Sequence, residues 1–182
     1  MSTLEIRKKT SHMGTLIIRP ISKTLAKDLI IRNHYSHKWN TPFGLYNFGL
    51  FQEGAPDECL GVAVYGWPKC PRAKNYISDV PNGWMCELNR MWIDDCLGKN
   101  SESILISASL KLLRLFDSAI VAVQSFADGR LGCGTIYKAA NFDYYGYHIT
   151  RFFRDKMTGE IFHEQGLSNS ACRSRFLHKN ID

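Results

Sequence analysis

Four polar residues interrupt or follow segments that are otherwise apolar: Arg90, Ser125, Asp128 and Tyr137. A buried guanidinium needs a partner, and the carboxylate of Asp128 is the best candidate partner for Arg90. Asp128 could also accept a proton as a general base. These residue types could therefore take part in a reaction that moves a proton. A structural ion pair, a cap on the following turn and core packing of Tyr137 are the competing interpretations.

Two further candidates, His34 and Tyr35, lie in the segment Asn33-His-Tyr-Ser36 at the end of an expected helix. Histidine titrates near neutral pH, so His34 could shuttle protons. Packing and capping of the helix end would explain the same pair. Aromatic residues in or beside expected loops could stack on a planar ring of a ligand, or could simply pack. These are Trp39, Phe43, Trp67 and Trp84.

Two segments could bind the anionic part of a group donor. Lys99 and Ser101 stand at the start of an expected helix, whose N-terminus attracts anions. Gly132 and Gly134 have the spacing of a glycine-rich loop. The histidines at 148, 163 and 178 are too dispersed to form a metal set, and none of the six cysteines forms a CxxC pair. We therefore predict no metal site, and we expect the cysteines to be free, buried thiols.

Hydrophobic periodicity predicts the elements that position these residues. We expect helices at 22–33, at 101–116 and from the glycine-rich turn to about 141, and the tail after 168 could form a final basic helix. The apolar faces of the first two helices would contain Leu25, Leu29 and Ile30, and Leu105, Ala108, Leu112 and Leu115. The expected strands are 15–19, 45–51, 60–66, 84–93, 118–125, about 144–153 and 160–163. Helices interleaved with strands indicate an α/β fold, with a mixed central sheet covered by helices on both faces. One domain over 15–182 would follow an N-terminal tail of 1–14.

More detailed expectations concern the strands at 84–93 and 118–125. Strict alternation would place Cys86, Leu88, Arg90 and Trp92 on one face of the first strand. The second is almost continuously apolar, which is typical of a strand buried on both faces. We expect the two strands to splay apart, leaving a cleft that Arg90 and Asp128 approach.

The composition is that of an ordinary globular protein: 182 residues, 45% hydrophobic, 22% charged and a formal charge of +6. The positive charge favours polyanionic partners such as nucleic acid. No apolar run approaches the roughly 18 residues needed to span a bilayer, and the N-terminus lacks the apolar region of a secretory signal. A cytoplasmic location without membrane contact is therefore expected. Basic residues gather near both ends, at 7–9, 151, 154, 156, 173, 175 and 179.

The element order resembles the fold of the GCN5-related N-acetyltransferases, as does the segment Ile136-Tyr-Lys-Ala-Ala-Asn-Phe142. Four blocks together are similar in order and spacing to those of the Mom family of DNA-modification proteins. They are Asn33-His-Tyr-Ser36, Glu87-Leu-Asn-Arg-Met-Trp92, Ser125-Phe-Ala-Asp128 and Gly132-Cys-Gly-Thr-Ile-Tyr-Lys-Ala139.

This resemblance implies transfer of a carbamoylmethyl (acetamido) group to N6 of adenine in double-stranded DNA, which protects phage DNA from host restriction. Asp128 and Tyr137 would act on the amine, and Arg90 and Ser125 would orient the donor or the base. The donor stays unidentified. An acetyl-CoA-like donor is in doubt, because the segment Asp94-Asp-Cys-Leu-Gly-Lys-Asn-Ser101 lacks the glycine pair of a pyrophosphate loop. An acyl-CoA N-acetyltransferase for a protein or small amine, and a non-catalytic DNA-binding protein, remain open.

Overall fold

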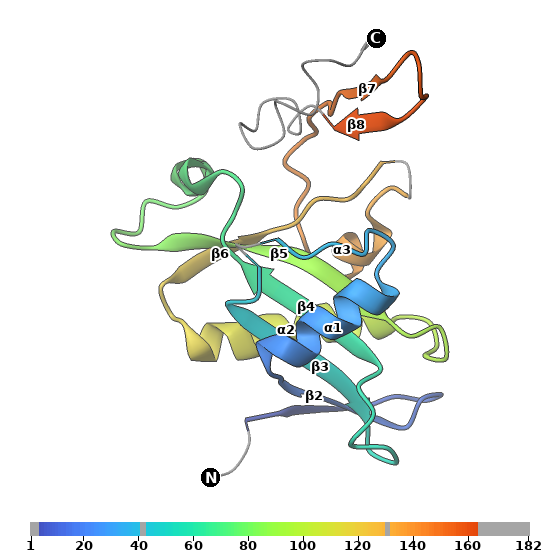
Figure 1. Cartoon of the computed structure of the whole chain (residues 1–182). Coiled ribbons are helices and arrows are strands. Elements are labelled where there is room, and N and C mark those ends of the chain that lie inside the picture. The colour runs from blue at the N-terminus through green and yellow to red at the C-terminus, as the bar shows by residue number, and fades with distance from the viewer. Residues whose placement is uncertain (1–3, 41–42, 130–131, 164–182) are drawn as a thin grey trace. The chain divides into compact units, whose positions relative to one another are not determined.

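The computed structural model describes residues 4–40, 43–129 and 132–163 (Figure 1). The chain forms two compact units, Met1–Phe142 and Asp143–Asp182. All the candidate site residues belong to the first unit. A single domain over 15–182 stays a prediction.

The first unit is built on a mixed six-stranded sheet. Five strands run antiparallel to their neighbours, and the sixth pairs in parallel with the fifth. In sheet order the strands are β1 (Ile6–Lys9), β2 (Thr15–Pro20), β3 (Tyr46–Gln52), β4 (Gly61–Gly66), β5 (Trp84–Ile93) and β6 (Ile120–Gln124). This confirms the predicted mixed α/β sheet. β1 lies within the expected tail, so residues 6–9 belong to the sheet.

Helices cover both faces of this sheet, as predicted (Figure 1). α1 begins where expected, because the side chain of Ser22 caps it by accepting a 3.1 Å hydrogen bond from the Leu25 amide. A short 3-10 helix, η1, lies in the long loop between β4 and β5. The helices are α1 (Lys23–Asn33), η1 (Pro71–Tyr76), α2 (Ser101–Phe116) and α3 (Thr135–Ala139).

Two apolar clusters hold the helices to the sheet. On one face, Ala26 and Ile30 of α1 pack with Val62 and Val64 of β4 and with Phe43. On the other, α2 packs against β2, β3, β4 and β5, and Tyr137 and Ala140 lie in or against the same cluster. We call these the α1-side and α2-side clusters.

The helix faces were predicted only in part. Leu25 of α1 is exposed, and so is Leu115 of α2, with 69% of its surface accessible. In α2 the sheet buries Ile106 and Leu113 in addition to Leu105 and Leu112. Helical spacing identifies an apolar stripe, but the position of the sheet decides which part of it is covered.

β6 differs from the expected doubly buried strand. All its residues are only half-buried, because β6 is at the edge of the sheet and β5 is its neighbour. The later strands β7 (Phe152–Arg154) and β8 (Ile161–His163) pair with each other in the second unit. The strand expected over about 144–153 is therefore confined to three residues, and the helix considered after 168 lies outside the described residues.

Within the described segments, no helix is long and apolar enough to cross a bilayer. Five cysteines, at 59, 70, 86, 96 and 133, are free thiols, and Cys172 lies outside these segments. The expectation that the thiols are buried is correct for Cys86 and wrong for Cys70, Cys96 and Cys133, which are exposed.

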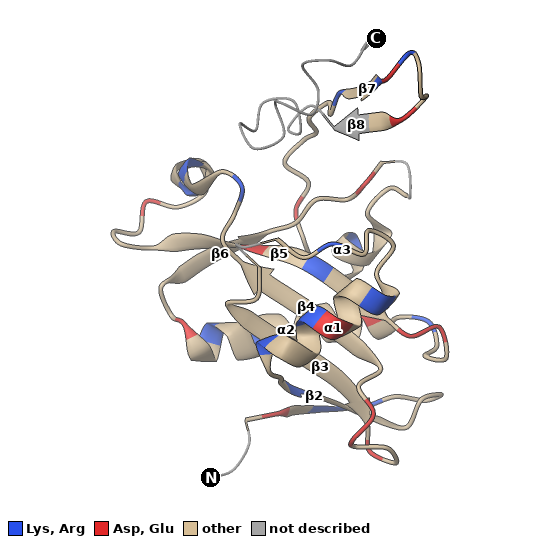
Figure 2. Cartoon of the chain, viewed as in Figure 1, with Lys and Arg blue, Asp and Glu red and all other residues tan. Residues whose placement is uncertain are grey.

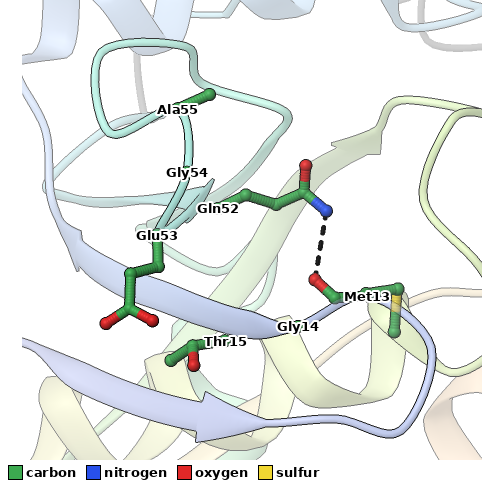
Figure 3. Close-up of a pocket in the computed structure, with 7 residues that line it drawn as sticks. All are labelled: Met13, Gly14, Thr15, Gln52, Glu53, Gly54 and Ala55. Atoms are coloured by element: carbon green, nitrogen blue, oxygen red, sulfur yellow. Dashed lines mark hydrogen bonds between the residues drawn. The ribbon is translucent and has the colours of Figure 1, made fainter.

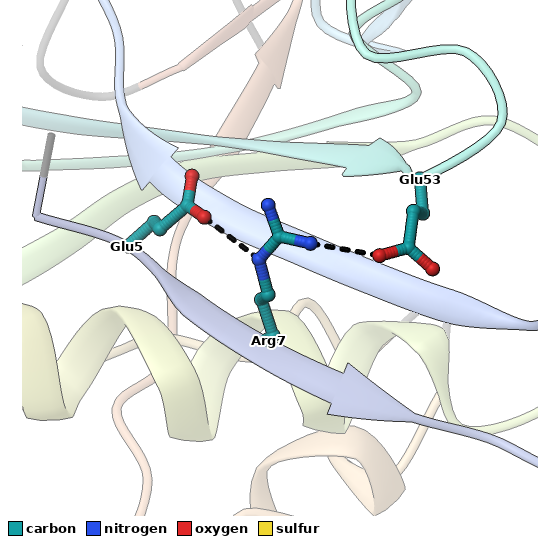
Figure 4. A network of polar contacts seen from close by, with 3 residues as sticks. All are labelled: Glu5, Arg7 and Glu53. Carbon is teal, nitrogen blue, oxygen red and sulfur yellow. Dashed lines mark hydrogen bonds and ion pairs between the residues drawn. The ribbon is translucent and has the colours of Figure 1, made fainter.

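Two surface features involve the β1–β2 turn. A hollow lies between that turn and the β3–β4 connection, where Gln52 donates a 3.2 Å hydrogen bond to the Met13 carbonyl (Figure 3). Beside it, Arg7 forms ion pairs with Glu5 and Glu53 at 2.8 and 2.7 Å (Figure 4). Exposed pairs of this kind add little stability. Neither feature includes a candidate site residue.

Candidate functional site

The site is shaped by a bulge in β5. Arg90 pairs with Val64 of β4, but the next pair joins Leu88 to Tyr65, so Asn89 has no residue opposite it. An extra residue of this kind is a β-bulge, which bends the strand and changes the direction of its side chains. The bulge falls inside the Glu87-Leu-Asn-Arg-Met-Trp92 block.

Because of the bulge, the predicted alternation along β5 is wrong. Cys86 and Leu88 lie in the α2-side cluster, whereas Trp92 packs against the α1-side cluster. Arg90 also lies on the α1 side, with its guanidinium carbon 4.7 Å from the centre of the Phe43 ring. The extra residue shifts the alternation by one position between Leu88 and Arg90.

Glu87 is buried, with 4% of its surface accessible, and three neutral donors hold its carboxylate. Oε2 accepts hydrogen bonds from the Lys69 amide at 3.0 Å and from Gln124 Nε2 at 2.8 Å. Oε1 accepts one from Asn89 Nδ2 at 3.2 Å. Among the described residues, no ion pair involves Glu87. A buried carboxylate without a cation depends on such donors, so Glu87 organises the strands and loop around it.

Pairing between β5 and β6 ends at this point. The last pair joins Glu87 to Gln124, while β5 continues to Ile93 alongside β4. The next residue after β6, Ser125, donates its hydroxyl to the Leu88 carbonyl at 3.4 Å. Ser125 is therefore brought beside the bulge, at the carboxyl end of β6.

The expected ion pair between Arg90 and Asp128 is not formed. Arg90 instead donates from Nη1 to the carbonyl of Asn89 at 2.7 Å, and its guanidinium lies over Phe43. Burial lowers the pKa of Arg90 from its ordinary value. The bulge turns Arg90 toward the α1 side, where its neighbours are aromatic.

His34 and Tyr35 lie near Arg90, so the structure brings three of the candidates together. The Tyr35 ring, mostly exposed, lies 4.2 Å from the His34 ring. His34 is buried, and its Nδ1 accepts a 3.1 Å hydrogen bond from the Ser36 amide, which leaves the ring proton on Nε2. Burial, and then the charge of Arg90, lower the pKa of His34 to about 4. A His34 ring with this pKa is neutral near pH 7, and its role in the reaction stays a prediction.

The low pKa of His34 predicts a pH-dependent stability. The unfolded chain, with an ordinary histidine pKa of 6.5, binds a proton more readily than the native state does. The contribution of His34 to the free energy of unfolding is therefore complete above pH 6.5 and is lost as the pH falls toward 4. The loss between pH 7 and pH 5 is about 2 kcal/mol. Urea denaturation at both pH values should show this loss in the wild type and in a variant of the exposed His12, His12→Asn. In His34→Asn the loss of unfolding free energy between pH 7 and pH 5 should be smaller by about 2 kcal/mol. An unchanged loss would contradict the lowered pKa of His34.

The segment that ends at Asp128 lies against the start of α3, which carries Tyr137. Gly134, with φ of +74°, precedes α3, and a Cβ placed there would lie 3.4 Å from Ala127 Cβ and 3.6 Å from Tyr137 Cδ2. The segment that carries Asp128 therefore folds back against the start of α3. Tyr137 packs against Phe142, with ring centres 5.7 Å apart. Asp128 is half-buried.

Comparison with known families decides the identity of the chain. Residues 15–181 match the Mom protein family. The chain belongs to this family. It is 36% identical over 170 residues to the methylcarbamoylase mom of Escherichia phage Mu, an alignment that covers 91% of the chain and 68% of that relative.

Among solved structures, this Mom family member is similar in fold to aminoglycoside acetyltransferases. The AAC(6')-Iy complex with a CoA bisubstrate analogue matches with a TM-score of 0.51 and 12% identity, covering 74% of the chain and 95% of the acetyltransferase. AAC(6')-Ih from Acinetobacter baumannii matches at 0.49 and 11%, with the same coverage. The predicted acetyltransferase-like fold is confirmed.

The predicted donor-binding residues of the Mom family chain lie at two helix starts. Lys99 is exposed, but the hydroxyl of Ser101 is buried and lies 3.4 Å from Glu102 Oε2. A carboxylate in the first turn of α2 opposes binding of a pyrophosphate there. Gly132 is exposed, and Gly134 adopts a left-handed conformation at the start of α3. These positions stay predictions.

The loop aromatics have different environments. Phe43 is buried beneath Arg90, and Trp39 packs against it edge to face. Trp84 donates from Nε1 to Asp117 at 3.1 Å. Trp67 is half exposed and stacks on Trp84, with ring centres 4.7 Å apart. Trp67 is thus the aromatic of this set best placed to meet a ligand.

Sequence reasoning missed Glu87, Asn89 and Gln124 as site residues of the Mom family chain. The available signal was the presence of two polar residues, Glu87 and Asn89, in a ten-residue strand that is otherwise mostly apolar. Gln124 gave no such signal, because its role depends on pairing with a strand 37 positions earlier in the chain.

Proposed function

We propose that this chain is a DNA-modifying transferase that adds a carbamoylmethyl (acetamido) group to N6 of adenine in double-stranded DNA. The observation that carries the proposal is membership of the Mom family over residues 15–181, with 36% identity to a phage methylcarbamoylase. Its role would be to protect phage DNA from restriction enzymes in the cytoplasm of the host cell.

In this reaction the N6 nitrogen forms a bond to the methylene carbon of the acetamido donor. The bond between that carbon and the leaving group breaks, and the leaving group departs with the electron pair. One N6 proton must be removed, because the lone pair of the amine is delocalised into the ring and attacks poorly. We assign Asp128 as the base that removes the N6 proton and Tyr137 as the acid that donates a proton to the departing group. This assignment is supported by the approach of their segments around Gly134.

The remaining candidates would position the reactants. Ser125 and Arg90 flank the bulge in β5 and would orient the donor or the base. Neutral His34 would act through its Nε2 proton as a hydrogen-bond donor. Tyr35, stacked on His34 and exposed, would contact the base or donor directly.

Adenine stacked in a duplex does not reach such a site, so the base must be flipped out, at a cost of roughly a few kcal/mol. Exposed aromatic side chains could offset this cost by stacking. Trp67, which is half exposed, is one such side chain in the first unit. Lys and Arg residues on α1 and α3 of the first unit and on β7 of the second offer contacts to phosphate (Figure 2).

Duplex binding should weaken steeply with salt. Contacts to about four phosphates would reduce affinity by ~10²-fold between 50 and 200 mM salt, through counterion release. Fluorescence anisotropy of a labelled duplex measures this effect. The uncharged dye alone serves as the control. Binding that is absent at low salt, or indifferent to salt, would contradict duplex DNA as the substrate and favour a small amine.

The proposed reaction is tested by mass spectrometry of nucleosides from plasmid DNA of cells that express the chain. The expected product is deoxyadenosine heavier by one carbamoylmethyl group in place of hydrogen. Unmodified deoxyadenosine from cells containing folded protein would count against the proposal. An acetylated small amine or protein in the same cells would instead identify an ordinary acetyltransferase.

A further inference from the structure

Two buried polar atoms at the β5 bulge have no hydrogen-bond partner among the described residues: Asn89 Oδ1 and Arg90 Nε. The first is an acceptor and the second is a donor. They belong to consecutive residues, and Asn89 is 6% exposed. Buried polar groups are almost always paired, because an unpaired one loses its hydrogen bonds to water without replacement. An unpaired acceptor and an unpaired donor on consecutive residues therefore need an explanation.

The orientation of Asn89 is determined by its neighbours. Its Nδ2 donates to Glu87 Oε1 at 3.2 Å and to the Trp67 carbonyl at 3.4 Å, and both of these oxygens only accept. Reversing the amide would lose both bonds, so Oδ1 is the atom left without a partner. Arg90 is held by the bond from Nη1 to the Asn89 carbonyl and by the Phe43 ring.

We propose that Asn89 and Arg90 bind the primary carboxamide of the group that is transferred, an inference that rests on the proposed function. The carboxamide oxygen accepts from Arg90 Nε, and its NH₂ group donates to Asn89 Oδ1. A primary carboxamide presents one acceptor and one donor side by side, which matches the two unpaired atoms.

The same arrangement discriminates against related groups. A carboxymethyl group has no N–H for Asn89 Oδ1, and its negative charge would be placed near the buried carboxylate of Glu87. An acetyl group lacks the N–H and would leave Asn89 Oδ1 unpaired. The site therefore selects carbamoylmethyl over both.

Both atoms are buried, so a ligand reaches them only when the covering segment shifts. Residues 67–69 contact this site through the 3.4 Å bond from Asn89 to Trp67 and the 3.0 Å bond from the Lys69 amide to Glu87. The bond to Trp67 is long and weak, and the Trp67 side chain is half exposed. We therefore expect a displacement of residues 67–69 to admit the ligand.

The test uses acetamide as the probe, with acetate at the same concentration and pH as its comparison. Nuclear magnetic resonance of the ¹⁵N-labelled full chain observes the Asn89 side-chain amide and the Arg90 Nε–H directly. Acetamide is expected to shift both signals, saturating in the millimolar range. Acetate can be attracted to the Arg90 guanidinium but offers no N–H to Asn89 Oδ1, so it is expected to leave the Asn89 signal unchanged.

Variants provide the matched control. Asn89→Leu and Arg90→Lys should reduce the acetamide affinity at least tenfold. Asn47→Leu should not, although Asn47 is also buried with an unpaired Oδ1, because it lies on β3 and its Nδ2 donates to Gly44. The dispersion of the backbone signals reports whether each variant is folded. The titration of the wild type tests the proposal even if a variant does not fold.

If acetamide shifts neither signal in the wild type, the proposal is overturned whether or not DNA is modified. Equal shifts with acetate would overturn the selectivity for an amide. Selective shifts by acetamide in a protein that leaves DNA unmodified would support the carboxamide site and contradict the proposed reaction.

Discussion

Asp128→Asn is expected to lose about 10²–10⁴-fold of the DNA-modification rate while the protein stays folded, because the carboxamide does not accept the N6 proton. Asparagine has nearly the size of aspartate, so a half-buried position next to the turn at Gly129 accommodates it. The rate is measured as carbamoylmethylated adenine formed in plasmid DNA over time. Thermal unfolding of the same preparation shows whether the fold is kept.

The matched control is Asp143→Asn, which makes the same change at an exposed acidic residue. This variant should modify DNA as the wild type does. Full modification by a folded Asp128→Asn protein would remove Asp128 from the mechanism. Loss of folding in that variant would show instead that Asp128 stabilises the turn between β6 and α3.

Glu87→Leu is expected to lower the free energy of unfolding by about 3 kcal/mol, because it leaves the Lys69 amide, Gln124 and Asn89 without their acceptor. Glu87→Gln should cost less. The Asn89 amide can turn over and accept from the new NH₂ group, giving up only its long bond to Trp67. Urea denaturation of the three proteins measures their free energies of unfolding, which should decrease in the order wild type, Glu87→Gln, Glu87→Leu.

Glu53→Gln is the control for the Glu87 variants. Glu53 is exposed, and its ion pair with Arg7 links β1 to the β3–β4 connection at the surface (Figure 4). Loss of this pair should change the unfolding free energy by less than about 1 kcal/mol. Equal stabilities of Glu87→Leu and the wild type would mean that the Glu87 cluster does not hold β5, β6 and the loop together.

The sequence by itself determined the features that depend on neighbouring residues. Ser22 caps α1 because its hydroxyl and the Leu25 amide are three residues apart. α2 follows from apolar residues at helical spacing, and the order of helices and strands implied the mixed sheet. The four sequence blocks were sufficient to indicate the Mom family, since they needed only residue types and spacing.

Only the tertiary structure decided how the site is arranged. The bulge at Asn89 arises from pairing of β5 with β4, and no local pattern in β5 predicts which residue is left unpaired. That one residue places Arg90 on the α1 side, over the Phe43 ring. The carboxylate of Glu87 accepts hydrogen bonds from Lys69, 18 positions earlier in the chain, and from Gln124, 37 positions later. The pKa of His34 likewise depends on burial and on Arg90. Hydrogen bonds and burial across such separations are set by how the strands meet, and periodicity within a single strand does not report on them.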